Sequence, residues 1–122
     1  MNEQAEALKQ RTKRFALDVI VLARAFPPAE PSWTVSRQLI RSATSVGANY
    51  RAACRARSHA DFVAKIALVE EESDEAGYWL EIAKDAGLSS PTMIDPLLKE
   101  ADELTAIFAR STMTARQSSK RP

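Results

Sequence analysis

Residues 35–55 read VSRQLIRSATSVGANYRAACR, and the spacing of apolar and basic residues in this stretch predicts an amphipathic helix. At about 100° per residue, a helix places the apolar side chains on one face and four arginines on the other. The apolar face consists of Val35, Leu39, Ala43, Val46, Tyr50 and Ala53. The arginine stripe consists of Arg37, Arg41, Arg51 and Arg55. One face must therefore be buried against other helices, while the arginine stripe presents guanidinium groups to a partner.

Three further amphipathic segments flank this helix, and residues that start or end helices bound them. Pro27 and Pro28 end the first segment. Ser58 and Asp61 form a capping box before the third segment, and Gly87 follows it. We predict helices over about residues 3–26, 32–56, 59–86 and 91–110. The expected fold class is all-α: residues 1–110 form a single-domain, antiparallel up-and-down four-helix bundle, and residues 111–122 form a flexible basic tail.

The composition excludes several classes of protein. Cys54 is the single cysteine among 122 residues, so no intramolecular disulfide can form, as is typical of a reducing cytoplasm. No apolar run approaches the roughly 20 residues of a membrane span, and the first residues lack the basic-then-apolar order of a signal peptide. We therefore expect a cytoplasmic protein with no membrane partner.

The sequence also lacks the usual catalytic constellations. The single histidine, His59, follows the capping Ser58 in a first helical turn, which is usually solvent-facing. A di-iron bundle needs a histidine three residues after an inward-facing glutamate, and Glu70, Glu71 and Glu72 have none there. We expect no catalytic residue, no metal site, no cofactor and no small-molecule substrate.

Two residues of the arginine-bearing helix are interpreted as structural. Gly47 lacks a side chain, so it allows another helix to approach closely. Asn49 borders the apolar face, and we expect it to hydrogen-bond across a helix pair. Direct contact of these residues with a ligand is the alternative.

Charge is distributed unevenly along the chain, although the net charge is only +1. Residues 1–60 hold ten basic and four acidic residues, a net charge of +6. Residues 61–109 hold three basic and twelve acidic residues, a net charge of −9, and residues 110–122 add +4. The segments either neutralise one another, within or between subunits, or present separate patches to different partners.

The third predicted helix carries a second apolar cluster beside its main stripe, with acidic residues among its members. The set consists of Leu68, Glu71, Glu72, Glu75, Trp79 and Ile82. A wide core stripe explains these residues in one interpretation. In the other they form an oligomer interface, with Trp79 as an anchor and the acids facing the arginines of a neighbouring subunit.

Several motifs resemble a known family. They are Arg41 to Asn49 (RSATSVGAN), Arg57-Ser58 with Asp61-Phe62, Ile66-Ala67, Glu70-Glu71-Glu72 with Glu75, and Tyr78-Trp79-Leu80. They resemble the bacterial four-helix-bundle proteins encoded in intervening sequences of 23S ribosomal RNA genes, a ribosomal-protein-like family related to the accessory variability determinant of diversity-generating retroelements. The resemblance covers roughly residues 15–108, and Gly47 stands where the family commonly has proline. It implies a bundle assembled into a ring, typically a homopentamer, that associates with RNA or RNA–DNA hybrids through basic surface.

Two functions follow from these observations. The first is a non-enzymatic, homo-oligomeric RNA-binding protein whose arginine stripe contacts phosphates of a structured RNA or RNA–DNA hybrid, independently of sequence. The basic tail and Lys9, Arg11, Lys13 and Arg14 would add affinity. The alternative is a structural or protein–protein interaction module, in which the same arginines pair with acids of the third helix across subunits.

Overall fold

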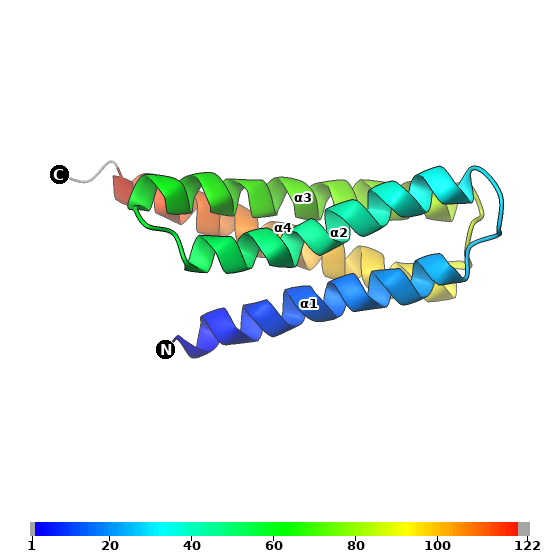
Figure 1. The fold of residues 1–122 in the computed structure, drawn as a ribbon, viewed down its shortest axis with the longest axis horizontal. Coiled ribbons are helices and arrows are strands. Elements are labelled where there is room, and N and C mark those ends of the chain that lie inside the picture. The colour runs from blue at the N-terminus through cyan, green and yellow to red at the C-terminus, as the bar shows by residue number, and fades with distance from the viewer. Residues whose placement is uncertain (1, 120–122) are drawn as a thin grey trace.

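The computed structural model describes residues 2–119, which form four helices running up and down along one axis (Figure 1). They are α1 (Glu3–Arg24), α2 (Ser32–Cys54), α3 (His59–Asp85) and α4 (Pro91–Ser119). No strand occurs among the described residues. The prediction of an all-α, four-helix fold is therefore confirmed. None of the described helices is long and apolar enough to cross a membrane.

Side-chain caps explain where α1 and α3 begin. The Asn2 side chain accepts a hydrogen bond from the backbone N–H of Gln4 at 2.9 Å, at the start of α1. At the start of α3, the Ser58 hydroxyl oxygen accepts one from the Asp61 amide at 3.0 Å, which is one half of the predicted capping box. Each cap satisfies a backbone N–H that the first helical turn leaves without a partner.

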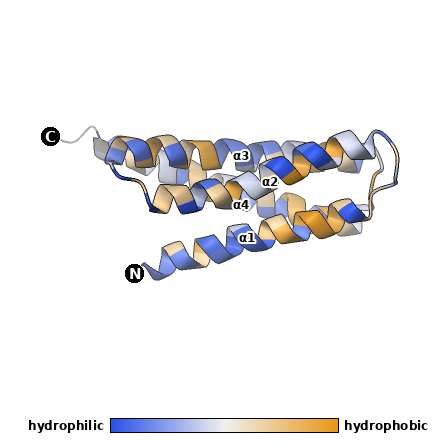
Figure 2. Ribbon diagram, in the orientation of Figure 1, coloured by the Kyte–Doolittle hydropathy of each residue, from blue (hydrophilic) through white to orange (hydrophobic). Residues whose placement is uncertain are grey.

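The apolar face of α2 lies in the middle of one core. All six of its predicted members are buried. The Tyr50 ring packs against the Phe108 ring of α4, with 5.4 Å between the ring centroids. Figure 2 shows that hydrophobic residues of α1 concentrate in its second half, toward the α1–α2 loop, whereas its first half is hydrophilic. The core is therefore continuous, and α1 contributes to it mainly near that loop.

The helix α1 is placed by close contact with α2. A Cβ atom added at Gly47 would lie 3.2 Å from Thr12 Oγ1 and 3.5 Å from Thr12 Cβ, so the two helices meet at a position without a side chain. Arg11 ties α1 to α4 through Glu100, with hydrogen bonds of 2.8 and 2.7 Å. Toward its N-terminus α1 diverges from α4, while it stays alongside α2 (Figure 1).

The hydrogen bond of Asn49 differs from the one predicted. Its Nδ2 donates to the Ser45 carbonyl oxygen at 2.8 Å, one turn earlier in the same helix, and not across a helix pair. A half-buried amide in a helix can satisfy a donor on the preceding turn, so no second helix is required.

The expected flexible tail is wrong for residues 111–119, because α4 continues to Ser119. Thr112 and Ala115 are buried and extend the stripe formed by Leu104 and Phe108. The Ala115 carbonyl oxygen lies 2.8 Å from Nε2 of His59, which ties the end of α4 to the start of α3. The sequence did not indicate this part of the helix, because its buried residues are small or polar and do not form a visible apolar stripe. Residues 120–122 of the predicted tail lie outside the described residues.

A pair of glycine substitutions tests the close approach of α1 to α2. We expect Gly47→Leu to lower the free energy of unfolding by about 1–3 kcal/mol, because the added side chain overpacks the contact with Thr12. Gly77→Ala is the control: its Cβ would lie 3.7 Å from Ala101 Cβ, an ordinary contact, so better helix propensity should stabilise the protein by about 0.5–1 kcal/mol. Urea unfolding followed by circular dichroism measures both, and a Gly47→Leu variant as stable as the parent contradicts the expectation.

A second pair tests the extended α4. Ala115→Asp places a carboxylate at a buried position and should destabilise the protein by about 2 kcal/mol or more. Met113→Asp, at a side chain that is 60% exposed two residues earlier, should change stability by less than about 0.5 kcal/mol. Equal thermal stability of the two variants would show that the last turns of α4 do not pack on the bundle.

Candidate nucleic-acid interface

The four arginines of the predicted stripe are all exposed, three on α2 and Arg55 as its C-cap, but their surroundings differ. Arg41 faces α3, whereas Arg51 and Arg55 border a groove between α1 and α2. Arg37 lies near the start of α2, with its guanidinium 3.5 Å from the Thr34 hydroxyl oxygen. The stripe therefore divides into positions with different electrostatic partners.

Arg41 belongs to an ion-pair network within one chain. Its guanidinium donates to Glu72 Oε2 at 2.9 Å and also to Glu75. The Trp79 indole N–H donates to the same Glu75 oxygen at 3.3 Å. Hydrogen bonds to Glu72 and then Glu75 raise the pKa of Arg41 above its ordinary value, with the attraction of both carboxylates adding to the effect. The positive charge of Arg41 is therefore offset by two acids of its own subunit.

The predicted interface set on α3 is only partly exposed. Glu72 and Glu75 already have Arg41 as a partner, and Trp79 and Ile82 pack against the core. Leu68 is 40% exposed, and Glu71 points away from the bundle. Leu68 and Glu71 are therefore the members of this set that the single chain leaves most available.

Arg51 and Arg55 line a groove of about 500 Å³ together with Lys9 and Lys13 of α1. We call this groove, with its four cationic residues, the basic groove. Arg51 and Arg55 form no ion pair among residues 2–119, and Glu6 is the carboxylate that lines the groove within the same part of the chain. The cationic side chains are thus brought together without a matching set of acids.

Small residues also line the basic groove, namely Ala16 on α1 and Thr44, Gly47 and Ala48 on α2. They add little bulk between the long cationic side chains. A chain of phosphates fits such a surface because Lys and Arg reach it from both walls.

The bundle is also electrically polarised along its long axis. Both ends of the described chain and the α2–α3 loop lie at one end of the bundle, which we call the terminal end (Figure 1). The segments nearest it, residues 2–13, 44–66 and 106–119, hold nine Lys/Arg and three Asp/Glu, a net charge of +6. The remaining described residues hold six Lys/Arg and thirteen Asp/Glu, a net charge of −7. An anionic partner is therefore attracted to the terminal end, where the basic groove lies.

Sequence reasoning identified Lys9 and Lys13 as additional cations but did not place them opposite Arg51 and Arg55. Gly47 is the residue that could have indicated this arrangement. A close contact of α1 with α2 at Gly47 sets which residues of α1 lie beside the arginines. Among the described residues, no group of three or more His, Cys, Asp or Glu side chains comes together to hold a metal ion.

The model of the 23S rRNA-intervening sequence protein family matches residues 5–110. The chain belongs to this family. A crystal structure of a protein of unknown function, from the S23 ribosomal protein family of Bacteroides thetaiotaomicron VPI-5482, is similar to this member, with a TM-score of 0.79 and 27% sequence identity. The similarity covers 85% of this chain and 96% of that one. No curated protein matches this member of the 23S rRNA-intervening sequence family.

The unequal surroundings of the arginines lead to a stability prediction. Arg41→Gln should lower the free energy of unfolding by about 1 kcal/mol, because it leaves Glu72, which is only 12% exposed, without its partner. The expected loss of stability is small because the Arg41 side chain is 48% exposed and water screens its ion pairs. Arg37→Gln removes the same charge without breaking an ion pair found in the described chain, so we expect a change under about 0.5 kcal/mol. Chemical denaturation of both variants tests the difference, and an equal effect would count against the Arg41 network.

Proposed function

We propose that this protein is a non-enzymatic, homo-oligomeric RNA-binding protein of the cytoplasm that holds the phosphate backbone of a structured RNA or an RNA–DNA hybrid. The observation that carries the proposal is the basic groove, where Lys9, Lys13, Arg51 and Arg55 converge. Lys9 pairs with Glu6 at 3.4 Å, and the other three form no ion pair within residues 2–119. Binding of this kind is independent of sequence and sensitive to salt, because it depends on the release of counterions from phosphates.

The arginine stripe contributes unequally in this proposal. Arg51 and Arg55 act at the groove, and Arg37 extends the cationic surface along α2. Arg41 contributes less, because Glu72 and Glu75 offset its charge. Helical RNA suits such a surface, since proteins recognise it largely through its shape and its phosphates.

Oligomerisation would multiply this weak interaction. Four cations on one subunit provide few phosphate contacts, but a ring, proposed here to be a pentamer, presents several grooves to one nucleic acid and gains avidity. Exposed apolar side chains support contacts between copies. On α1 and the start of α2 these are Leu17, Val21 and Trp33, which are 47, 61 and 53% exposed, and on α3 it is Leu68.

The Arg41 network favours a second candidate, a protein–protein interaction module. In this alternative the arginines and the α3 acids form pairs between subunits as well as the pairs seen within one chain. Glu71 is exposed on α3, which supports its pairing with a neighbour's arginines in this alternative. Nucleic-acid binding would then be absent, and loss of arginines would weaken the assembly.

Charge-removal variants distinguish the two functions. Arg51→Gln/Arg55→Gln should weaken binding of a fluorescent RNA hairpin, and the slope of log Kd against log salt should fall by about two, because two phosphate contacts are lost. Arg24→Gln/Lys99→Gln removes two exposed positive charges from the opposite end of the bundle and should leave the slope nearly unchanged. Fluorescence anisotropy over a salt series measures both.

Sedimentation of the same variants completes the test. Weaker RNA binding with an unchanged sedimenting mass supports the RNA-binding function. Dissociation of Arg51→Gln/Arg55→Gln into smaller species supports the interaction module instead. Parent protein that binds no hairpin at low salt would contradict the proposal directly.

A further inference from the structure

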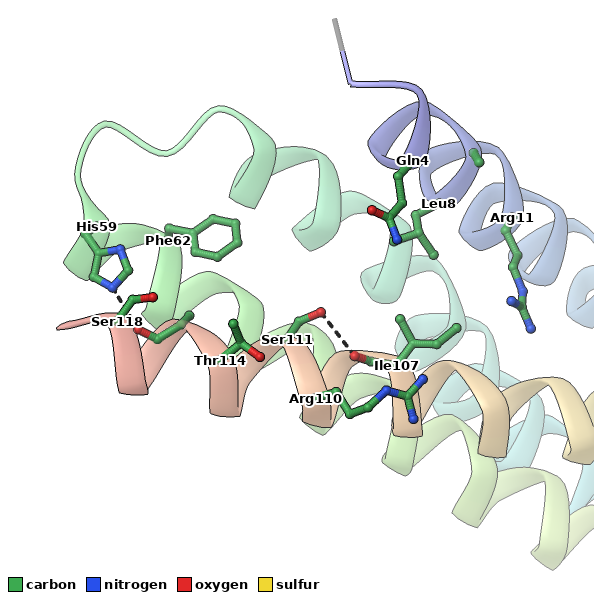
Figure 3. Close-up of a pocket in the computed structure, with 12 residues that line it drawn as sticks. Gln4, Leu8, Arg11, His59, Phe62, Ile107, Arg110, Ser111, Thr114 and Ser118 are labelled. Carbon is green, nitrogen blue, oxygen red and sulfur yellow. Dashed lines mark hydrogen bonds between the residues drawn. The ribbon is translucent and has the colours of Figure 1, made fainter. Parts of the chain in front are cut away.

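The terminal end of the bundle holds a cleft of about 840 Å³ on the flank of α1 that faces α4 (Figure 3). Helix α1 contributes Gln4, Leu8 and Arg11, the start of α3 contributes His59 and Phe62, and α4 contributes residues from Ile107 to Ser118. The cleft exists because α1 diverges from α4 beyond the contact between Arg11 and Glu100 (Figure 1). Its volume lies within the range of roughly 300–1,000 Å³ that is usual for small-molecule sites.

The walls of this cleft are apolar, with polar groups beside them. Leu8, Phe62 and Ile107 are half-buried hydrophobic side chains at the edge of the core. The Ser111 hydroxyl, which donates to the Ile107 carbonyl oxygen at 3.1 Å, stands next to them with the Gln4 amide across the opening (Figure 3). A flat heterocycle suits this combination, because its faces need apolar contact and its edge needs hydrogen bonds.

The two arginines of the cleft differ in the charge they offer. Arg11 forms ion pairs with Glu100 and with Glu103, and its guanidinium lies 3.0 Å from the Glu103 carboxylate. The hydrogen bonds to Glu100 are the main cause that raises the pKa of Arg11. Arg110 is exposed and forms no ion pair within residues 2–119. Arg110 is therefore the cation that remains available to an anionic group at the rim.

We propose that this cleft binds an unpaired nucleotide, with the base against Phe62, Leu8 and Ile107 and the phosphate at Arg110. The inference rests on the proposed function and names a second contact for the same nucleic acid. The basic groove lies on the flank of α1 that faces α2, and the cleft lies on the opposite flank. A strand that continues past a duplex in the groove reaches the cleft by crossing one helix, a distance of about 10 Å.

Titration of the full-length protein with adenosine monophosphate tests the cleft without any RNA. The expected result is saturable changes in the NMR signals of Phe62, Ile107 and Arg110, at lower concentrations than with adenosine alone or with inorganic phosphate alone. Phe62→Leu keeps an apolar side chain but removes the flat ring, and should weaken binding about five-fold or more. Arg110→Gln should reduce the advantage over adenosine, whereas Arg24→Gln at the far end of α1 should not.

Three outcomes overturn the inference. One is that adenosine monophosphate changes only the signals of the basic groove. Another is that it acts no differently from phosphate. The third is that a fatty-acid probe such as dodecanoate fills the cleft while the nucleotide does not, which would identify the cleft as a site for an apolar anion.

A comparison of two RNA hairpins separates this inference from the proposed function. A hairpin with a three-nucleotide single-stranded extension should bind at least about five-fold more tightly than the same hairpin with a blunt end. Phe62→Leu should remove that difference and leave the affinity for the blunt hairpin unchanged, and Arg51→Gln/Arg55→Gln should weaken both complexes. Equal affinity for the two hairpins overturns the proposal of nucleotide binding in the cleft and leaves the proposal for the basic groove intact. Failure to bind either one overturns the groove, and the nucleotide titration then decides the cleft by itself.

Discussion

The approach of α1 to α2 at Gly47 is the contact on which the rest of the surface depends. Thr12 packs where a side chain at residue 47 would otherwise stand, so α1 lies low against α2. This contact brings Lys9 and Lys13 of α1 into the same groove as Arg51 and Arg55. Because α1 is held on the α2 side, its first turns separate from α4 and leave the cleft at Phe62 open. One position without a side chain therefore shapes both hollows of the terminal end.

Electrostatic neighbours then decide what each cation can do. Arg41 and Arg11 both hold two carboxylates, so their charges serve to join helices within the bundle. No residue of α3 lines the groove that Arg51 and Arg55 border, and neither arginine forms an ion pair among the described residues, so their charge remains available. Arg41 and Arg11 therefore connect helices, while the basic groove, where Glu6 pairs with Lys9 alone, is the surface proposed to hold phosphate.

The sequence predicted the helices and the buried face of α2 well, because both depend on local periodicity. Ser58 caps α3 as expected, and Gly87 at φ +72° follows its end. The end of α4 could not be recognised in the same way. Thr112 and Ala115 bury little apolar area, so their stretch resembles a solvated tail until the start of α3 is placed beside it. Asn49 was assigned a partner on another helix, but Ser45 on its own helix provides one.

Local sequence pattern was enough to predict which face of each helix is buried and that the arginine stripe lies away from the core. Periodicity suffices for this, because burial of apolar side chains is driven by a pattern that repeats along one helix. Only the tertiary structure decided which of those arginines keeps an available charge and how the basic residues gather at one end. Within residues 2–119, segments of +6, −9 and +2 along the chain become ends of +6 and −7 in space when antiparallel helices are folded together. Electrostatic interaction depends on distance in space, so its partners come from helices that no local pattern connects.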